Sequence, residues 1–159
     1  MFLNKIKLFL VISICLTIFF LTYNDVKSYE IKIIDGDTIN LNGEKIRFIG
    51  IDTPELKQTC NKNNKVIYCG VEARKMLIEK IGNNKVHCIS ESKDQYKRTL
   101  AECFVNNVSL SSFLVREGYA FAYRKYSKKF VNDEDYAREN KMGMWSMKFE
   151  YPWDYRKKN

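Results

Sequence analysis

The sequence predicts an α+β fold in which short antiparallel strands form a small barrel and helices pack beside it. Three observations carry this prediction. Short apolar runs bounded by turn residues dominate residues 29–51. An apolar stripe of helical spacing follows at residues 70–81, and two further strand-like runs surround a polar turn at residues 92–97. No repeat, low-complexity run or linker separates these segments, so we expect one compact domain.

Residues 1–28 are predicted to be an export signal and not a part of the fold. Lys5 and Lys7 precede the uncharged run "LFLVISICLTIFFL", and "VKS" at residues 26–28 offers small residues for cleavage near Ser28. The run is shorter than the roughly 20 residues that a membrane-spanning helix needs. The alternative is an uncleaved membrane anchor. We therefore expect the protein to be secreted, periplasmic or in the cell envelope, with membrane contact only through an uncleaved signal.

Three strands are predicted at the start of the mature chain. Residues 29–34 form the first strand, and "DGDT" at residues 35–38 is a tight turn into a second strand at residues 39–41. The dipeptide Asn42-Gly43 is a strong signal for a two-residue hairpin turn. Residues 44–51 then return as the third strand, paired with the second.

Residues 70–81 are predicted to form a helix, because Ala73, Met76, Leu77 and Ile81 share one stripe and Gly82 can end it. Residues 86–91 and 98–105 then form two strands around the polar turn "SKDQYK". Five short antiparallel strands with one helix between the third and fourth are the order of an OB-type barrel.

Two more helices are predicted after the last strand. One covers about residues 109–117 and stops at Gly118, and the other begins with Asn132 or Asp133 as its cap and stops near Gly143. The tail carries three large aromatic residues that we expect to pack against the fold: Trp145, Tyr151 and Trp153.

The chain is basic. Its formal charge is +8, and loss of three lysines and one aspartate with the signal leaves +6 on residues 29–159. A basic surface suits a polyanionic partner such as a nucleic acid, and a merely solvated surface is the alternative.

Cysteine usage agrees with export. Removal of Cys15 with the signal leaves an even number, which indicates disulfides in an exported chain. Three connectivities are possible. If residues 86–91 and 98–105 pair about a tip near residues 95 and 96, Cys88 lies opposite Cys103. This register favours the pairs Cys60–Cys69 and Cys88–Cys103. A zinc site is the alternative, although no CxxC pair is present and the only histidine, His87, adjoins Cys88 on a strand.

Two acidic clusters are predicted to meet at one end of the first hairpin. "DGDT" precedes the second strand and "DTPE" at residues 52–55 follows the third. Because these strands are partners, Asp37 and Asp52 converge, with Glu55 close by. Converging carboxylates repel unless a cation lies between them, and hard oxygen ligands suit calcium or magnesium. Ordinary turn-forming aspartates are the alternative.

Two arginines favour the metal-site interpretation. Arg47 lies in the strand that leads to Asp52, and Arg98 starts the fifth strand. An arginine fork matches phosphate oxygens, so a metal, a spare carboxylate and two arginines suit phosphodiester cleavage. A regular strand would send Arg47 and Asp52 to opposite faces, because they are five positions apart. We therefore predict a bulge or bend at Gly50.

Six motifs in order resemble the staphylococcal nuclease-like (thermonuclease) family: "IDGDT", "IRFIGIDTPE", "CGVEARKML", "DQYKRTLAEC", "LVREGYAFAY" and "GMWS". They cover nearly the whole mature chain. The resemblance implies a five-stranded OB-fold-type β-barrel with three helices. It also implies calcium-dependent hydrolysis of DNA and RNA that leaves 3′-phosphate ends. The paired cysteines resemble those of a secreted bacterial subgroup.

The same resemblance implies roles for the acids. Asp37 and Asp52 match the carboxylates that hold one calcium ion, and the backbone carbonyl of Thr53 matches a third ligand. Glu55 matches the acid that deprotonates or positions the attacking water.

The resemblance also implies the groups that contact the substrate. Arg47 and Arg98 match the two phosphate-binding arginines, with Arg98 as the partner of the leaving oxygen. Three tyrosines are expected at the nucleotide pocket, Tyr96, Tyr123 and Tyr126, and Lys97 is expected to add a contact to the substrate phosphate. Lys97 replaces a glycine that the family commonly has there, which puts the backbone of that turn in question if a positive φ is needed. Gln95 replaces a lysine that contacts phosphate in some members.

The predicted function is therefore an exported endonuclease whose catalytic domain is residues 29–159. We expect one calcium ion, DNA and RNA as partners, no protein partner and a monomer. The alternative is a non-catalytic OB-fold module that only binds nucleic acid, and a third possibility is an envelope-anchored OB domain of structural role. Relatives that only bind lose some of the acids and arginines, whereas this chain keeps all five, so the enzyme is favoured.

Overall fold

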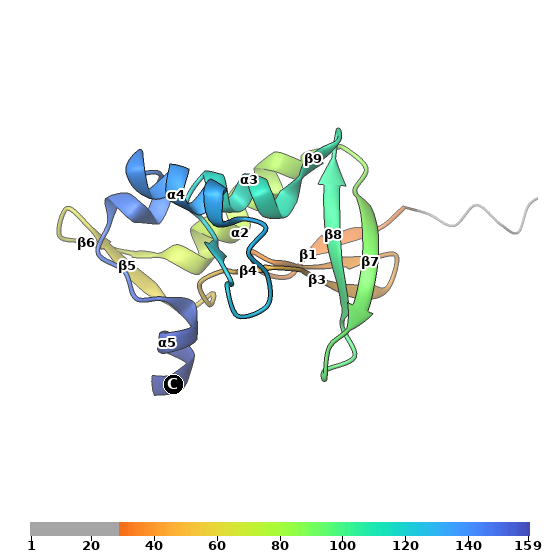
Figure 1. The fold of residues 1–159 in the computed structure, drawn as a ribbon, viewed down its shortest axis with the longest axis horizontal. Helices are drawn as coiled ribbons and strands as arrows, with labels where there is room; N and C mark the ends of the chain where they lie inside the picture. Colours follow the sequence, from red (N-terminus) through yellow and green to blue (C-terminus); the bar gives the residue numbers. More distant parts are fainter. Residues whose placement is uncertain (1–28) are drawn as a thin grey trace, which may run out of the picture.

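The computed structural model describes residues 29–159, and the predicted export signal lies outside the described residues (Figure 1). Within this range the elements are, in chain order, β1 (Ile31–Ile33), β2 (Thr38–Leu41), β3 (Glu44–Phe48), β4 (Ile51–Asp52), β5 (Thr59–Lys62), β6 (Lys65–Tyr68), α2 (Cys69–Ile81), β7 (His87–Lys93), β8 (Thr99–Val105), β9 (Val108–Ser109), α3 (Leu110–Arg116), β10 (Phe121–Ala122), α4 (Val131–Glu139), the 3₁₀ turn η1 (Gly143–Ser146) and α5 (Pro152–Lys158).

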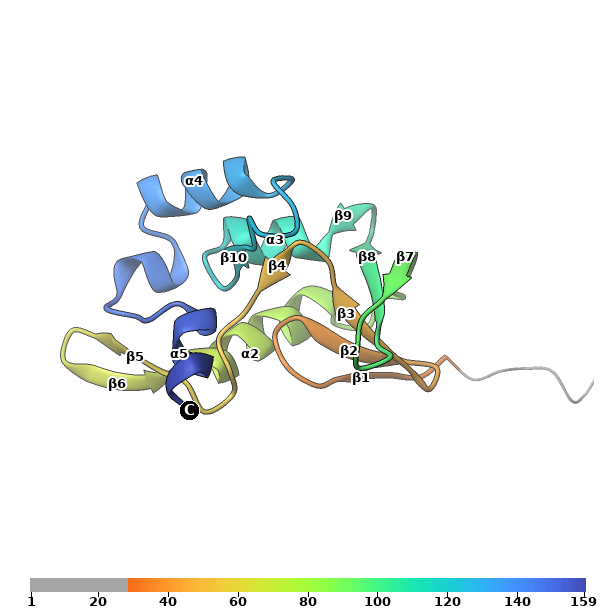
Figure 2. The same cartoon turned by 60° about the horizontal axis from the view of Figure 1, so that its bottom comes forward.

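A curled sheet in the order β1-β2-β3-β8-β7, with β9 paired to β8, lies at one end of the molecule, and the β5–β6 hairpin lies at the other (Figures 1 and 2). Helices α2 and α3 pack against it and against each other. The predicted α+β class and OB-type arrangement are confirmed. One detail was wrong: β3 and β8 pair in parallel, whereas all five strands were expected to be antiparallel. A parallel pair needs a long connection between its strands, and the segment from β3 to β8, which includes α2, provides one.

The third predicted strand, residues 44–51, is interrupted, as expected if Arg47 and Asp52 are to face the same site. β3 ends at Phe48, and Gly50 takes a φ of +74° that L-residues rarely adopt. The chain resumes as β4, which leaves the curled sheet and pairs with β10 in the register Phe121↔Asp52. The predicted bend at Gly50 is therefore confirmed, and it directs Asp52 away from the path of β3.

Two elements were not predicted. The hairpin of β5 and β6 turns at Asn63-Asn64, both with positive φ, and it lacks the apolar alternation that signals a strand. The tail forms α5, with Pro152 in its first turn, so residues 29–159 contain four α-helices where three were expected. In this part of the chain, each helix is too short or too polar to cross a bilayer.

The predicted cap of the third helix was wrong. Helix α4 begins at Val131, its N-cap is Phe130, and no side chain caps it. Asp133 instead lies inside the helix, where Oδ2 accepts a hydrogen bond from Ser112 Oγ at 2.7 Å. The carboxylate that the sequence pattern assigned to a local cap therefore binds a residue of α3 instead.

Two apolar clusters hold the fold. The larger one lies between the curled sheet and helices α2 and α3. It contains Leu77 and Ile81 of the predicted helical stripe, together with Phe48 and Leu114. The smaller one surrounds the fully buried ring of Phe121, whose centroid lies 5.0–6.1 Å from four aromatic rings of the tail: Trp145, Phe149, Tyr151 and Trp153. The tail aromatics are therefore packed, as expected.

Both favoured disulfides are present. Cys60 on β5 bonds Cys69 at the start of α2, and Cys88 bonds Cys103 directly across the β7–β8 ladder. The zinc alternative was wrong, because all four thiols are used in disulfides. The bond between Cys60 and Cys69 pins the unpredicted hairpin to α2, and Cys60 and Cys69 lie in the same cluster as Phe121.

The disulfide across the β7–β8 ladder should stabilise the protein measurably. Replacing both Cys88 and Cys103 by alanine should lower the free energy of unfolding by about 3 kcal/mol, because the bond closes a loop with a sequence separation of 15. The matched double alanine variant of Cys60 and Cys69, with a separation of 9, should lose about 0.5 kcal/mol less. Urea denaturation of the oxidised proteins measures both values; an unchanged midpoint in either variant contradicts the assigned role.

Candidate active site

Arg47 joins the two predicted metal acids. Its Nη1 lies 2.6 Å from Asp37 Oδ1, and its Nη2 lies 2.8 Å from Asp52 Oδ1. The register of the first hairpin explains half of this geometry, because Thr38 pairs with Arg47 and Asp37 is the preceding residue. The bend at Gly50 explains the other half, since it returns Asp52 to the same guanidinium. The structure therefore brings these three predicted residues together.

The turn that carries Asp37 is fixed by its own hydrogen bonds. Oδ2 of Asp37 accepts the backbone N–H of Thr53 at 3.1 Å, and its backbone carbonyl accepts the N–H of Phe48 at 2.8 Å. The Thr38 hydroxyl donates to Oδ1 at 3.1 Å. Thr53, the predicted third ligand, thus lies directly beside Asp37.

An arginine that the sequence analysis did not consider completes the cluster. Arg156 on α5 places Nη2 at 2.6 Å from Asp52 Oδ2 and Nη1 at 2.9 Å from Glu55 Oε1. Nη1 also donates to Asp52 Oδ1 at 3.2 Å. Figure 2 shows α5 beside the segment that follows β4. The contact spans 104 positions, so no local pattern signals it.

Glu55 is positioned by a buried glutamine and a close backbone approach. Oε1 of Gln58 accepts the Glu55 N–H at 3.2 Å, and its Nε2 donates to the Glu150 carbonyl at 2.7 Å. A Cβ at Gly70 would lie 2.0 Å from the Glu55 carbonyl oxygen, so only glycine fits there. The loop that carries Glu55 is thus packed between α2 and the C-terminal segment.

Burial makes this site electrostatically unusual. It raises the pKa of Asp37 from its ordinary 3.8 to about 6, against the opposing charge of Arg47. It also raises the pKa of Asp52, where the hydrogen bond from Arg156 opposes the shift and the charge of Asp37 adds to it. For Arg156, burial opposes the charged form, but the hydrogen bonds and charges of Asp52 and Glu55 together outweigh burial and raise its pKa.

The donor set fits a hard divalent cation. Two buried carboxylates that repel each other are stabilised by positive charge, which two guanidinium groups supply in this structure. Nowhere in residues 29–159 do three or more His, Cys, Asp or Glu side chains form a metal-binding group. A cation here would therefore be held by Asp37 and Asp52, with backbone oxygen and water completing its shell, as Ca²⁺ and Mg²⁺ accept.

Arg98 lies in the turn between β7 and β8 and bonds an acid of that same turn. Its Nε donates to Asp94 Oδ2 at 2.7 Å, and no hydrogen bond joins it to the three acids within residues 29–159. Its guanidinium carbon lies 5.4 Å from the centre of the Tyr96 ring, which is 70% exposed. Lys97 between them has a φ of +62°, so this turn does take the left-handed conformation that favours glycine.

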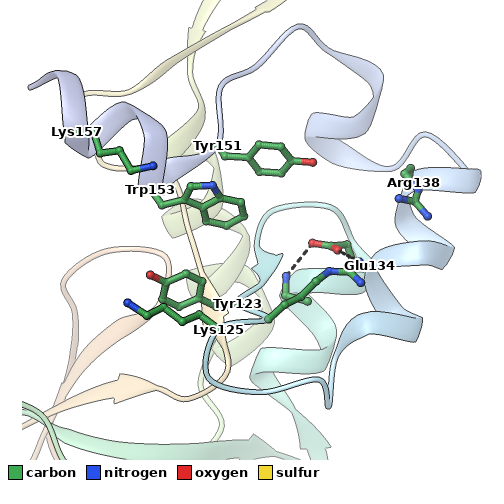
Figure 3. A pocket seen from close by; sticks show the side chains of 9 residues that line it. Tyr123, Lys125, Glu134, Arg138, Tyr151, Trp153 and Lys157 are labelled. Atoms are coloured by element: carbon green, nitrogen blue, oxygen red, sulfur yellow. Dashed lines mark hydrogen bonds and ion pairs between the residues drawn. The ribbon is translucent and has the colours of Figure 1, made fainter.

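Tyr123 lines a cavity of about 610 Å³ (Figure 3). The cavity begins where β10 ends, and β10 is the partner of Asp52 in β4. The rings of Tyr151, Trp153 and Tyr123 form a ladder, with near-parallel planes at 4.6 and 5.7 Å. Tyr126 meets Tyr123 edge-on at 5.0 Å and is itself exposed. Four basic residues line the same cavity: Arg124, Lys125, Arg138 and Lys157.

An OB-type sheet with paired buried acids and arginine forks is the arrangement that the structure describes. Comparison with known proteins identifies the family. Residues 45–147 match the family described as staphylococcal nuclease homologue. The match contains β3, where Arg47 lies, and extends to η1, so the chain belongs to this family. Helix α5 and its Arg156 lie beyond the matched residues.

Three relatives show the range of similar proteins. The micrococcal nuclease of Shigella flexneri is 28% identical over 84% of this chain and 82% of its own length. Endonuclease YncB of Bacillus subtilis is 34% identical over 72% of this chain and 59% of its own length. The probable staphylococcal-like nuclease CAN2 of Oryza sativa is 30% identical over 84% of this chain, which spans only 34% of that plant protein.

The raised pKa of Asp37 predicts a pH dependence of stability. An acid whose pKa is higher in the folded state contributes stability that is present below its unfolded pKa near 3.8 and lost as the pH rises through about 6. In a chelator, Asp37→Asn should therefore gain stability relative to the wild type by roughly 1–3 kcal/mol between pH 4 and pH 7. Thermal denaturation across this range measures the difference.

Glu79→Gln is the matched control, because Glu79 is an exposed acid on α2 whose neighbour Lys75 lies 3.9 Å away. The stability difference between this control and the wild type should show no comparable change from pH 4 to pH 7. A stability difference for Asp37→Asn that stays constant with pH contradicts the electrostatic account of Asp37.

Proposed function

We propose that this protein is a calcium-dependent endonuclease that hydrolyses phosphodiester bonds of DNA and RNA and leaves 3′-phosphate ends. One observation supports the proposal most strongly. Asp37 precedes β2, Arg47 lies in β3 and Asp52 ends β4, and the three side chains meet in one hydrogen-bonded cluster. Two buried acids arranged around a guanidinium serve no obvious purpose in packing, whereas a cation and a phosphate need both groups.

In this proposal Asp37, Asp52 and the Thr53 carbonyl hold one Ca²⁺. When bound, the ion supplies positive charge that stabilises the phosphoryl oxygens as negative charge develops on them. The raised pKa values of the two acids agree with this role. Burial destabilises their charged forms, so a bound cation would stabilise these carboxylates more than exposed ones.

Glu55 is proposed to orient the attacking water and accept its proton. Its side chain is 45% exposed, so water reaches it, while Gln58 holds its backbone. The water oxygen bonds to phosphorus, the bond from phosphorus to the 5′-oxygen breaks, and the leaving oxygen takes a proton. Arg47 and Arg98 are proposed to contact the phosphate; for Arg98 this needs the two terminal nitrogens that its bond to Asp94 does not use.

The cavity lined by Tyr123 supports a nucleic acid as the substrate. Aromatic rings and basic side chains together bind the bases and the phosphates of single-stranded chains. Tyr123 follows directly after β10, the strand partner of β4 in which Asp52 lies, and we propose that a bound chain extends from the acids toward this cavity. We propose that the protein acts as a monomer.

Cleavage of plasmid DNA in calcium tests the proposal. Glu55→Gln should lower kcat by about 10²–10⁴-fold, because the amide neither accepts the proton of the water nor carries charge. The product ends of the wild type should be 3′-phosphates, as shown by labelling with and without phosphatase. Excess chelator should abolish cleavage.

The same control, Glu79→Gln, should cleave like the wild type, since that residue is on the surface of α2. A Glu55→Gln enzyme as active as the wild type rules out the role of Glu55, and cleavage that resists chelation rules out the metal. Salt-sensitive binding without any cleavage supports the binding-only module instead.

Export is the remaining part of the proposal. The basic start and apolar run of residues 1–21 support a cleaved signal. N-terminal sequencing of the protein from the culture medium or envelope should give a mature start near residue 29. A start at Met1, with the protein in the membrane fraction, points to an uncleaved anchor.

A further inference from the structure

We infer that Arg156 is a positioning residue of the proposed nuclease site: it holds the Glu55 side chain in a fixed position relative to Asp52. The inference rests on the proposed function. Its basis is that one guanidinium bonds both acids at once: Nη2 binds Asp52 Oδ2 at 2.6 Å and Nη1 binds Glu55 Oε1 at 2.9 Å. Asp52 belongs to a strand, whereas Glu55 lies in the loop after it, so this bridge is what relates their side chains.

Within residues 29–159, Arg156 is the one side chain that bonds both carboxylates. Asp52 is fully buried and is held by the backbone pairing of β4 with β10. Gln58 and Gly70 fix the backbone of Glu55, but within residues 29–159 the only hydrogen bond of its carboxylate is to Arg156. Without Arg156, the Glu55 side chain would rotate among its solvent-exposed rotamers.

Helix α5 is packed firmly against the rest of the fold, so Arg156 can hold the two carboxylates in place. Pro152 is buried, and the ring of Trp153 stacks between Tyr151 and Tyr123. Upstream, Asn61 and Lys148 exchange both backbone hydrogen bonds, at 2.8 and 2.9 Å, and Gln58 bonds the Glu150 carbonyl. Aromatic and backbone contacts thus set the position of the helix independently of Arg156.

The position of the charge also matters for a bound cation. Arg156 shares the Asp52 carboxylate with any ion held there, and two positive charges on one carboxylate repel. Loss of Arg156 therefore leaves Asp52 more available to a cation while it releases Glu55. Loss of Arg156 should then lower the catalytic rate, while calcium affinity stays equal or rises.

The test compares Arg156→Gln, Arg156→Lys and the control Lys158→Gln, which alters an exposed residue of the same helix. Isothermal titration with calcium chloride alone measures affinity, and steady-state cleavage in saturating calcium measures kcat and KM. For Arg156→Gln we expect at least a 10-fold lower kcat, a KM within about 2-fold of the wild type, and calcium affinity equal or higher. Arg156→Lys should recover part of kcat, since one ammonium still reaches one acid. Lys158→Gln should match the wild type.

Each other outcome overturns the inference. Lower kcat with weaker calcium binding in both Arg156 variants shows that α5 merely supports the fold, and thermal denaturation would then show matching destabilisation. Higher kcat with tighter calcium binding shows that Arg156 blocks the site. Unchanged kcat and affinity show that Arg156 has no part in the reaction. A wild-type protein that binds calcium but cuts nothing overturns the proposed function itself, which separates the two failures.

Discussion

The guanidinium of Arg47 between Asp37 and Asp52 is the contact around which the rest of the structure is arranged. Two acids with almost no exposed surface repel each other and are costly to bury, so they need a shared counter-charge. The register of the first hairpin, the break at Gly50 and the pairing of β4 with β10 all meet this need. The same arrangement leaves carboxylates that a divalent cation would stabilise, so the requirement of the fold and the proposed chemistry coincide.

The second apolar cluster connects the C-terminal segment to these acids. Phe121 is opposite Asp52 in the β4–β10 pair, and its ring gathers the aromatic residues of the tail. Trp153 and Arg156 lie three positions apart on α5, so the packing of one delivers the other to Asp52. A segment outside the residues matched by the family is in this way integrated with the site, and the disulfide between Cys60 and Cys69 closes the same cluster.

Local and hairpin-range patterns were enough to place part of the site. Asp37, Arg47 and Asp52 were predicted to meet because a hairpin has a defined register and a glycine stood where a bend was needed. Arg98 was predicted to bind the phosphate, and its side chain also bonds Asp94 four residues earlier, a contact that the strand-based argument did not include. Arg156 was missed altogether: the pattern "PWDYRKK" indicates a short helix at most, and says nothing about which distant surface that helix covers.

Periodicity, turn residues and paired cysteines alone therefore determine the α+β class, the stripe of α2, the β7–β8 register and the order of the motifs, because each depends on neighbours within one hairpin or one helix. The parallel pairing of β3 with β8, the use of Asp133 to bind α3 and the arrival of α5 at the acids were decided by tertiary packing. These contacts join residues that are far apart in sequence. Their free energy depends on which buried surfaces meet, and that is a property of the whole folded chain rather than of any single segment.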